Sequence, residues 1–77
     1  MSINLRNYIL ENKFKVTILD DQINVVNYQE IDSFDDTKIV VRYERGTIII
    51  FGSDLSISKL LDDELLIGGK IFKVEFR

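Results

Sequence analysis

Residues 38–51 read KIVVRYERGTIIIF, and this run shows more clearly than any other how the protein folds. Apolar side chains take every second position from Ile39 to Tyr43, which is the period of a half-buried β-strand. Gly46 follows at the chain reversal, where a positive φ would suit a type I turn with a glycine bulge. Residues 47–51 are apolar on both faces, which predicts a central strand, or one covered by the core on one face and by a partner on the other.

Strand-like alternation continues on both sides of this hairpin. Residues 14–18 and 22–25 alternate before it, and residues 55–57 and 72–76 alternate after it. Pairs of turn-forming residues separate the segments: Asp20-Asp21, Asp35-Asp36, Gly52-Ser53 and Gly68-Gly69. The spacing predicts an all-β domain, a small antiparallel β-sandwich or roll of seven to eight short strands.

The first residues follow a different period. Leu5, Tyr8 and Ile9 are spaced i, i+3 and i+4, and Ser2 is a suitable cap for a helix that starts there. Residues 1–12 are therefore predicted to form a short N-terminal helix, with a frayed tail as the alternative. Residues 13–77 are predicted to form a single β domain.

Composition restricts the chemistry of this 77-residue chain. It has neither cysteine nor histidine, so disulfides, thiolate ligands and the commonest transition-metal ligand are excluded. A core of this size supplies only about 3–5 kcal/mol of net stability, and a partner subunit is the remaining way to add to it. We therefore expect a homo-oligomer. The net charge of −3 argues against a nucleic-acid partner.

No residue pattern typical of catalysis is present in the sequence. The serines have no histidine to activate them, and the paired carboxylates stand where turns are expected. We expect no enzymatic activity, no cofactor and no metal. The longest apolar run, residues 48–51, is far shorter than the ~20 residues of a membrane helix. No signal peptide is recognised. We therefore expect a cytoplasmic location and no direct insertion into a membrane.

An ordered set of glycines and aliphatic residues carries a family resemblance. The matching positions are Ile31, Phe34, Gly46, Ile48, Ile50, Gly52, Leu55, Ile57, Leu60, Glu64, Ile67, Gly69 and Ile71. With this set, the segment from Val16 to Phe76 resembles the YabP/YqfC family of bacterial sporulation proteins. Asp54 stands where the family often has asparagine, and Gly68 stands where it often has an acidic residue.

The resemblance implies a role in endospore formation, in the mother-cell compartment. It implies a non-enzymatic structural or adaptor protein that self-associates or docks to a membrane-protein partner. A small Sm-like RNA-binding ring protein is the alternative, because such rings also follow a short helix with a small β-roll. The basic residue that precedes the glycine in their last motif is missing before Gly68.

Two groups of residues are candidates for a functional role. The family-motif and turn residues are Gly46, Gly52, Asp54, Leu55, Ile57, Gly69 and Ile71. The candidates for an interface are Tyr43, Ile48, Ile50 and Phe51, which either fill the core or meet another chain. An open edge strand is a further means of recruiting a partner.

Overall fold

The computed structural model describes residues 13–77 and folds them into one antiparallel β-sheet. Its strands are β1 (Lys15–Ile18), β2 (Gln22–Val26), β3 (Glu30–Phe34), β4 (Lys38–Tyr43), β5 (Gly46–Leu60) and β6 (Glu64–Phe76). They lie in the order β1-β2-β6-β5-β4-β3. The all-β, antiparallel prediction is confirmed, while the helix predicted over residues 1–12 lies outside the described residues.

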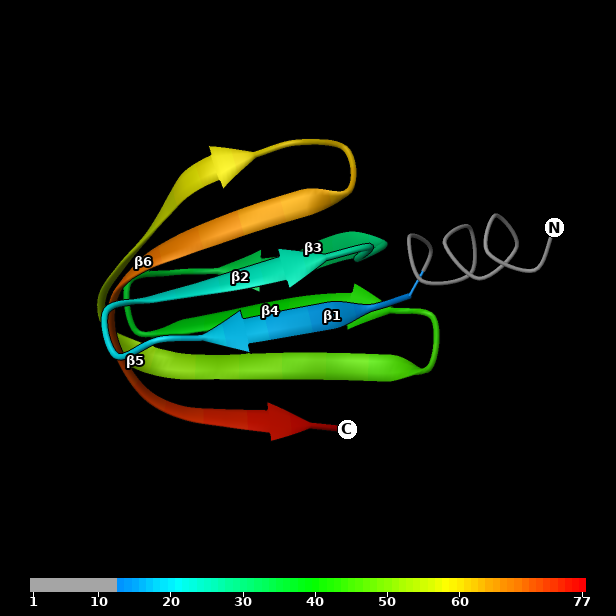
Figure 1. Ribbon diagram of the computed structural model, residues 1–77. Coiled ribbons are helices and arrows are strands. Elements are labelled where there is room, and N and C mark those ends of the chain that lie inside the picture. Colours follow the sequence, from blue (N-terminus) through cyan, green and yellow to red (C-terminus); the bar gives the residue numbers. More distant parts are fainter. Residues whose placement is uncertain (1–12) are drawn as a thin grey trace, which may run out of the picture.

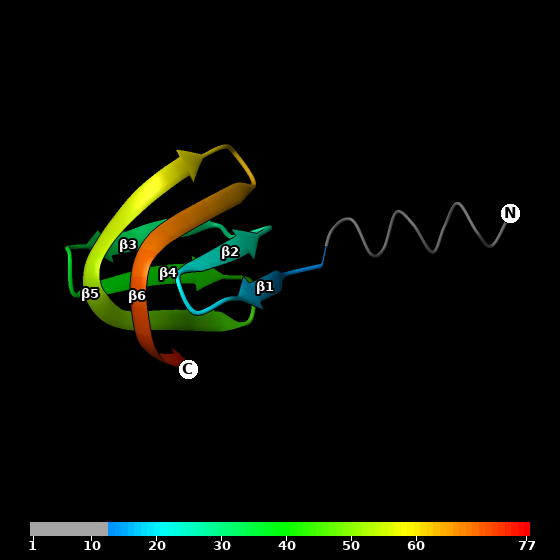
Figure 2. The same ribbon diagram turned by 60° about the vertical axis from the view of Figure 1, so that its left-hand side comes forward.

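The sheet folds over on itself because β5 and β6 are long and bent (Figures 1 and 2). We call the two halves the first and second layer. The first layer holds β3, β4, residues 46–53 of β5 and residues 70–76 of β6. The second layer holds β1, β2, residues 64–68 of β6 and residues 56–60 of β5. The described residues therefore form a rolled sheet in which two strands belong to both layers.

The core lies between these layers and is entirely aliphatic. Its buried residues are Ile23, Val25, Ile39, Val41, Ile48, Ile50, Leu55, Leu65 and Ile67. They alternate along each strand with outward-facing side chains, as the period of a strand requires. Burial of this apolar surface is the main source of stability in a domain without disulfides.

The described residues form six strands rather than seven or eight. The reason is that two predicted turns, Gly52-Ser53 and Gly68-Gly69, are bends within β5 and β6. The β5–β6 register shifts between Phe51 and Gly52 and again between Ser53 and Ser56, so the pairing continues through both glycine positions. Asp54 has a φ of 54° and Gly69 a φ of 126°. Bulges of this kind add a residue to one strand and bend it without ending it. A glycine that reads as a turn in the sequence therefore bends a continuous strand.

Two hairpin turns lie over the bend and accept hydrogen bonds from it. The backbone N–H of Gly52 donates to the carbonyl oxygen of Thr37 (3.0 Å), and that of Leu55 donates to the carbonyl oxygen of Asp36 (3.0 Å). On β6, the N–H of Gly69 donates to the carbonyl oxygen of Asp21 (3.1 Å). The β3–β4 and β1–β2 turns therefore accept hydrogen bonds from backbone N–H groups at the bend, which removes the cost of leaving these groups unpaired.

Gly46 lacks the positive φ that its turn position predicts. Tyr43 pairs directly with Gly46, so the β4–β5 loop consists of Glu44 and Arg45 alone. A Cβ at Gly46 would overlap the carbonyl oxygen of Arg77, which accepts a hydrogen bond from Thr47. Glycine is required here by the close approach of β6, and the predicted glycine bulge is wrong.

Substitution of Asp54 tests the bend directly. In the left-handed region asparagine and aspartate are tolerated, whereas other L-residues pay about 1–2 kcal/mol. Asp54→Asn should change the free energy of unfolding by less than about 0.5 kcal/mol. Asp54→Val should lower the free energy of unfolding by at least about 1–2 kcal/mol, because a β-branched side chain fits this backbone conformation worst. Urea denaturation measures both; equal stability of the two variants would contradict the assigned backbone conformation.

The Asp35 carboxylate organises the β3–β4 turn. Its Oδ1 accepts hydrogen bonds from the N–H of Thr37 (2.8 Å), the hydroxyl of Thr37 (2.8 Å) and the N–H of Lys38 (2.9 Å). These bonds, the Thr37 backbone first, lower the pKa of Asp35 below its ordinary value of 3.8. The ionised form is therefore favoured in the folded state.

A pH-dependent effect of this carboxylate is expected. A lowered folded-state pKa stabilises the fold above the ordinary value, and that stabilisation disappears as pH falls through the folded pKa. The stability difference between wild type and Asp35→Ala should thus be largest above about pH 5 and shrink below 3.8. Urea midpoints at a series of pH values measure it, with Asp36→Ala as the control for charge. A difference that is constant with pH would refute the role of the carboxylate.

Candidate functional site

The family-motif residues gather at the bend of the sheet. Gly52 and Asp54 bend β5, while Gly69 bends β6 directly opposite. A Cβ at Gly52 would overlap the carbonyl oxygen of Lys70, and one at Gly69 would lie 2.6 Å from the carbonyl oxygen of Asp54. Leu55 fills the core at the same point. The motif therefore shapes the backbone and supplies no reactive group.

The remaining motif residues flank this bend or lie away from it. Ile71 pairs with Gly52, and Ile57 pairs with Ile67 in the second layer; both are half-buried against the core. Gly46 lies at the other end of the first layer, beside Arg77. The structure thus brings most of the motif together around one backbone feature but leaves Gly46 apart from it.

The interface candidates divide between the core and the surface. Ile48 and Ile50 are fully buried inside this chain. Tyr43 is half-buried and stacks on Phe14, with ring centroids 3.8 Å apart and planes 7° from parallel. Phe51 lies on the outer face of the first layer beneath the Lys73 ammonium, 5.4 Å from the ring centroid. Of these residues, Phe51 and Tyr43 are the ones a partner can reach while the domain stays folded.

A further surface feature is the open edge of β6, residues 70–76. This segment pairs with β5 on one side and with no described strand on the other. Thr47 and Arg77 exchange hydrogen bonds in both directions, at 2.8 and 2.7 Å. Because bonding residues alternate along an antiparallel pair, the N–H and C=O groups of Val74 and Phe76 face away from β5. This edge therefore presents unpaired backbone groups.

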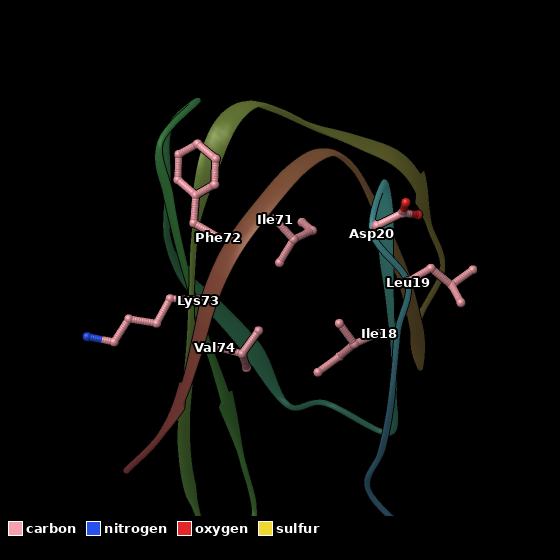
Figure 3. Close-up of a pocket in the computed structure, with 7 residues that line it drawn as sticks. All are labelled: Ile18, Leu19, Asp20, Ile71, Phe72, Lys73 and Val74. Atoms are coloured by element: carbon pink, nitrogen blue, oxygen red, sulfur yellow. The ribbon is translucent and has the colours of Figure 1, made fainter.

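An open groove of about 410 Å³ runs beside this edge, between β6 and the β1–β2 turn. It is lined by Ile18, Leu19, Asp20, Ile71, Phe72, Lys73 and Val74. Figure 3 shows Ile18, Ile71 and Val74 pointing into the space between the layers, while Phe72 and Lys73 point away from it. The groove is apolar inside, with the backbone edge of β6 as one wall.

Charged side chains follow the outer face of the same segment. Glu75 lies between two cations, 2.8 Å from the Lys73 ammonium and 2.8 Å from the Arg77 guanidinium. Hydrogen bonds from Lys73, and then from Arg77, hold the pKa of Glu75 below its ordinary value. Phe72 and Phe76, near the two ends of the segment, are 63% and 57% exposed. The edge thus combines exposed aromatic surface with alternating charge.

The other open edges carry features that hinder strand addition. β3 has a register shift between Ile31 and Ser33, and Arg42 pairs with its Glu30 and Asp32 at 2.9 and 2.6 Å. Residues 56–60 of β5 contain another register shift, and β1 is only four residues long. Bulges, charges and short length protect edges from pairing. The open segment of β6 also has a bulge, at Phe72, but from Lys73 to Phe76 it pairs with β5 in unbroken register, and the hydrogen bonds between Thr47 and Arg77 extend this pairing by one residue.

Sequence reasoning found the alternation in residues 72–76 but did not identify this strand as an open edge. Edge position depends on strand order, and the order places β6 between β2 and β5. The bend of β6 separates residues 64–68, which pair with β2, from residues 70–76, which do not. The signal available in the sequence was the presence of two aromatic residues, Phe72 and Phe76, in an alternating strand; the structure leaves both exposed.

Among residues 13–77, no group of three or more acidic side chains is placed to hold a metal ion. The same residues include no helix that is long and apolar enough to cross a bilayer.

Comparison with known proteins gives one result. The model of the YabP family matches residues 10–77. No curated protein matches the chain.

Proposed function

The chain belongs to the YabP family, and from this we propose that it is a non-enzymatic structural or adaptor protein of bacterial endospore formation. The observation that carries the proposal is the family match over residues 10–77, which includes all of the described domain. The family is associated with sporulation and is not a known enzyme family. The protein acts by binding, either to itself or to a membrane-protein partner, in the cytoplasm of the mother cell.

The arrangement of the motif supports a binding role. The residues that carry the family resemblance are used to bend β5 and β6 and to fill the core behind the bend. They fix the shape of a small domain whose reachable features are an exposed edge, a groove and a few aromatic side chains. A small rigid body with such an edge is suited to docking by strand addition.

An Sm-like RNA-binding ring is not favoured by any described feature. Such binding needs several cations gathered along one face, where they can contact phosphate. On the β6 edge Lys73 and Arg77 lie on either side of Glu75, and Arg42 on β4 lies beside Glu30 and Asp32, so neither group forms an uninterrupted cationic face. We therefore retain the sporulation role alone.

Deletion of the gene in its host tests the proposal. The mutant should grow normally but lose heat-resistant spores, and a copy of the gene at another locus should restore them. Electron microscopy of the arrested cells would show which layer of the spore fails and thereby indicate the partner. Normal counts of heat-resistant spores in a host without a second family member would refute the proposed function.

A further inference from the structure

We propose that the open edge of β6 binds the same edge of a second copy of this chain, antiparallel about a two-fold axis at Val74. The inference rests on the proposed function, since it names the contact by which a self-associating structural protein assembles. Pairing in this way extends the first layer of one copy into the first layer of the other. A surface that binds its own copy around a two-fold axis must be complementary to itself, and this edge meets that requirement.

The backbone of β6 allows this register. Residues that exchange hydrogen bonds across an antiparallel pair need N–H and C=O groups that face the partner strand. Val74 and Phe76 have them on the open side, because Glu75 and Arg77 lie at the positions that bond to β5. With the axis at Val74, this residue exchanges two hydrogen bonds with Val74 of the second copy. Phe76 then lies at the end of the paired segment, next to the bulge that Phe72 forms in the second copy.

The charges select this register over its neighbours. With the axis at Val74, Lys73 lies opposite Glu75 of the second copy, and the symmetric pair repeats the contact. These are the non-hydrogen-bonded positions, where opposed side chains approach most closely. An axis at Lys73 or at Glu75 would place that residue opposite its own copy, and like charges directly opposite are destabilising.

Apolar surface adds to the contact. Phe72 and Phe76 are the most exposed phenylalanines of the described residues, at 63% and 57%. Pairing brings both ends of the segment against the second copy and removes part of this aromatic surface from water. Aromatic side chains are a common source of binding energy at such contacts.

Charge exchange provides the test. Sedimentation equilibrium of the wild type should give twice the mass of the chain at sufficient concentration. Lys73→Glu places two acidic residues opposite each other, and Glu75→Lys places two basic ones, so each variant alone should self-associate at least about tenfold more weakly. An equimolar mixture of the two variants should associate as a heterodimer, because each opposed position then holds one acid and one base. The double variant Lys73→Glu/Glu75→Lys should dimerise like the wild type.

Circular dichroism is the control that each variant is folded. A wild type that stays monomeric at high concentration, or single variants that dimerise as well as the wild type, would overturn the inference. So would a mixture of the two single variants that fails to associate. Complementation separates this result from the proposed function: a monomeric wild type that still restores heat-resistant spores refutes only the dimer, whereas normal sporulation of the deletion strain refutes the function.

Discussion

Replacing Gly69 by alanine is expected to leave the protein largely unfolded at room temperature. The φ of Gly69 is 126°, a conformation that L-residues rarely adopt, and its backbone strain costs about 1–3 kcal/mol. A Cβ there would also lie 2.6 Å from the carbonyl oxygen of Asp54 and 3.0 Å from the Cα of Leu55. Overpacking against such backbone atoms costs about 1–3 kcal/mol more. The sum approaches the net stability of about 3–5 kcal/mol that a domain of this size has.

Gly68→Ala is the matched control at the preceding position. Gly68 has no positive φ, and a Cβ there would meet only the hydroxyl of Ser58 at 3.1 Å and that of Ser56 at 3.9 Å. This substitution should leave the free energy of unfolding unchanged or raise it by about 0.4–1 kcal/mol, because alanine lowers the conformational entropy of the unfolded chain. Urea denaturation followed by circular dichroism compares the variants. If Gly69→Ala and Gly68→Ala unfold at the same midpoint, the bend is not constrained as described.

Ile50→Asp is the second substitution with a large expected effect. Ile50 is fully buried between Ile39 of β4 and Val74 of β6. Removing the aliphatic side chain alone costs about 2–5 kcal/mol. Burying an unpaired carboxylate adds a further penalty or forces the group to take up a proton. The variant should therefore be unfolded at neutral pH, with a circular dichroism spectrum that lacks the wild-type β signal.

Ser56→Asp introduces the same carboxylate on the same strand but at an exposed position. It should remain folded, with a change in stability within about 0.5 kcal/mol. A folded Ile50→Asp variant would show that this strand face is not part of the core. A folded variant that has also become monomeric would restore Ile50 as a residue of the interface.

Much of this fold could be predicted from residue periodicity. Alternation located β1, β2, β4 and parts of β5 and β6 but not β3, and the Asp20-Asp21 and Asp35-Asp36 turns are present between strands. The two bends could not be predicted, because a glycine after an apolar run suits a turn and a bulge equally. The two differ only in whether the partner strand continues opposite, as Gly69 does opposite Asp54 and Leu55.

The candidate site could be predicted only in part. The motif residues were identified, but their shared position at the bend depends on the β5–β6 register. The run from Thr47 to Phe51 was expected to have two covered faces, and both Ile48 and Ile49 are indeed buried. Ile49 is 7% exposed yet lies outside the core cluster, on the opposite face from Ile48. Sequence alone could not assign which face belonged to the core.

The strand order also has a consequence for how the chain folds during synthesis. Four of the five strand pairings join strands that are neighbours in sequence, whereas β2 pairs with β6. Residues 22–26 therefore leave the ribosome long before residues 64–68, their partners on the other side. Pairings between distant residues slow folding, because the intervening loop must close first. The β1–β2 hairpin carries Ile23 and Val25 on its apolar face. This face stays exposed to water until β6 has been synthesised and has paired with β2.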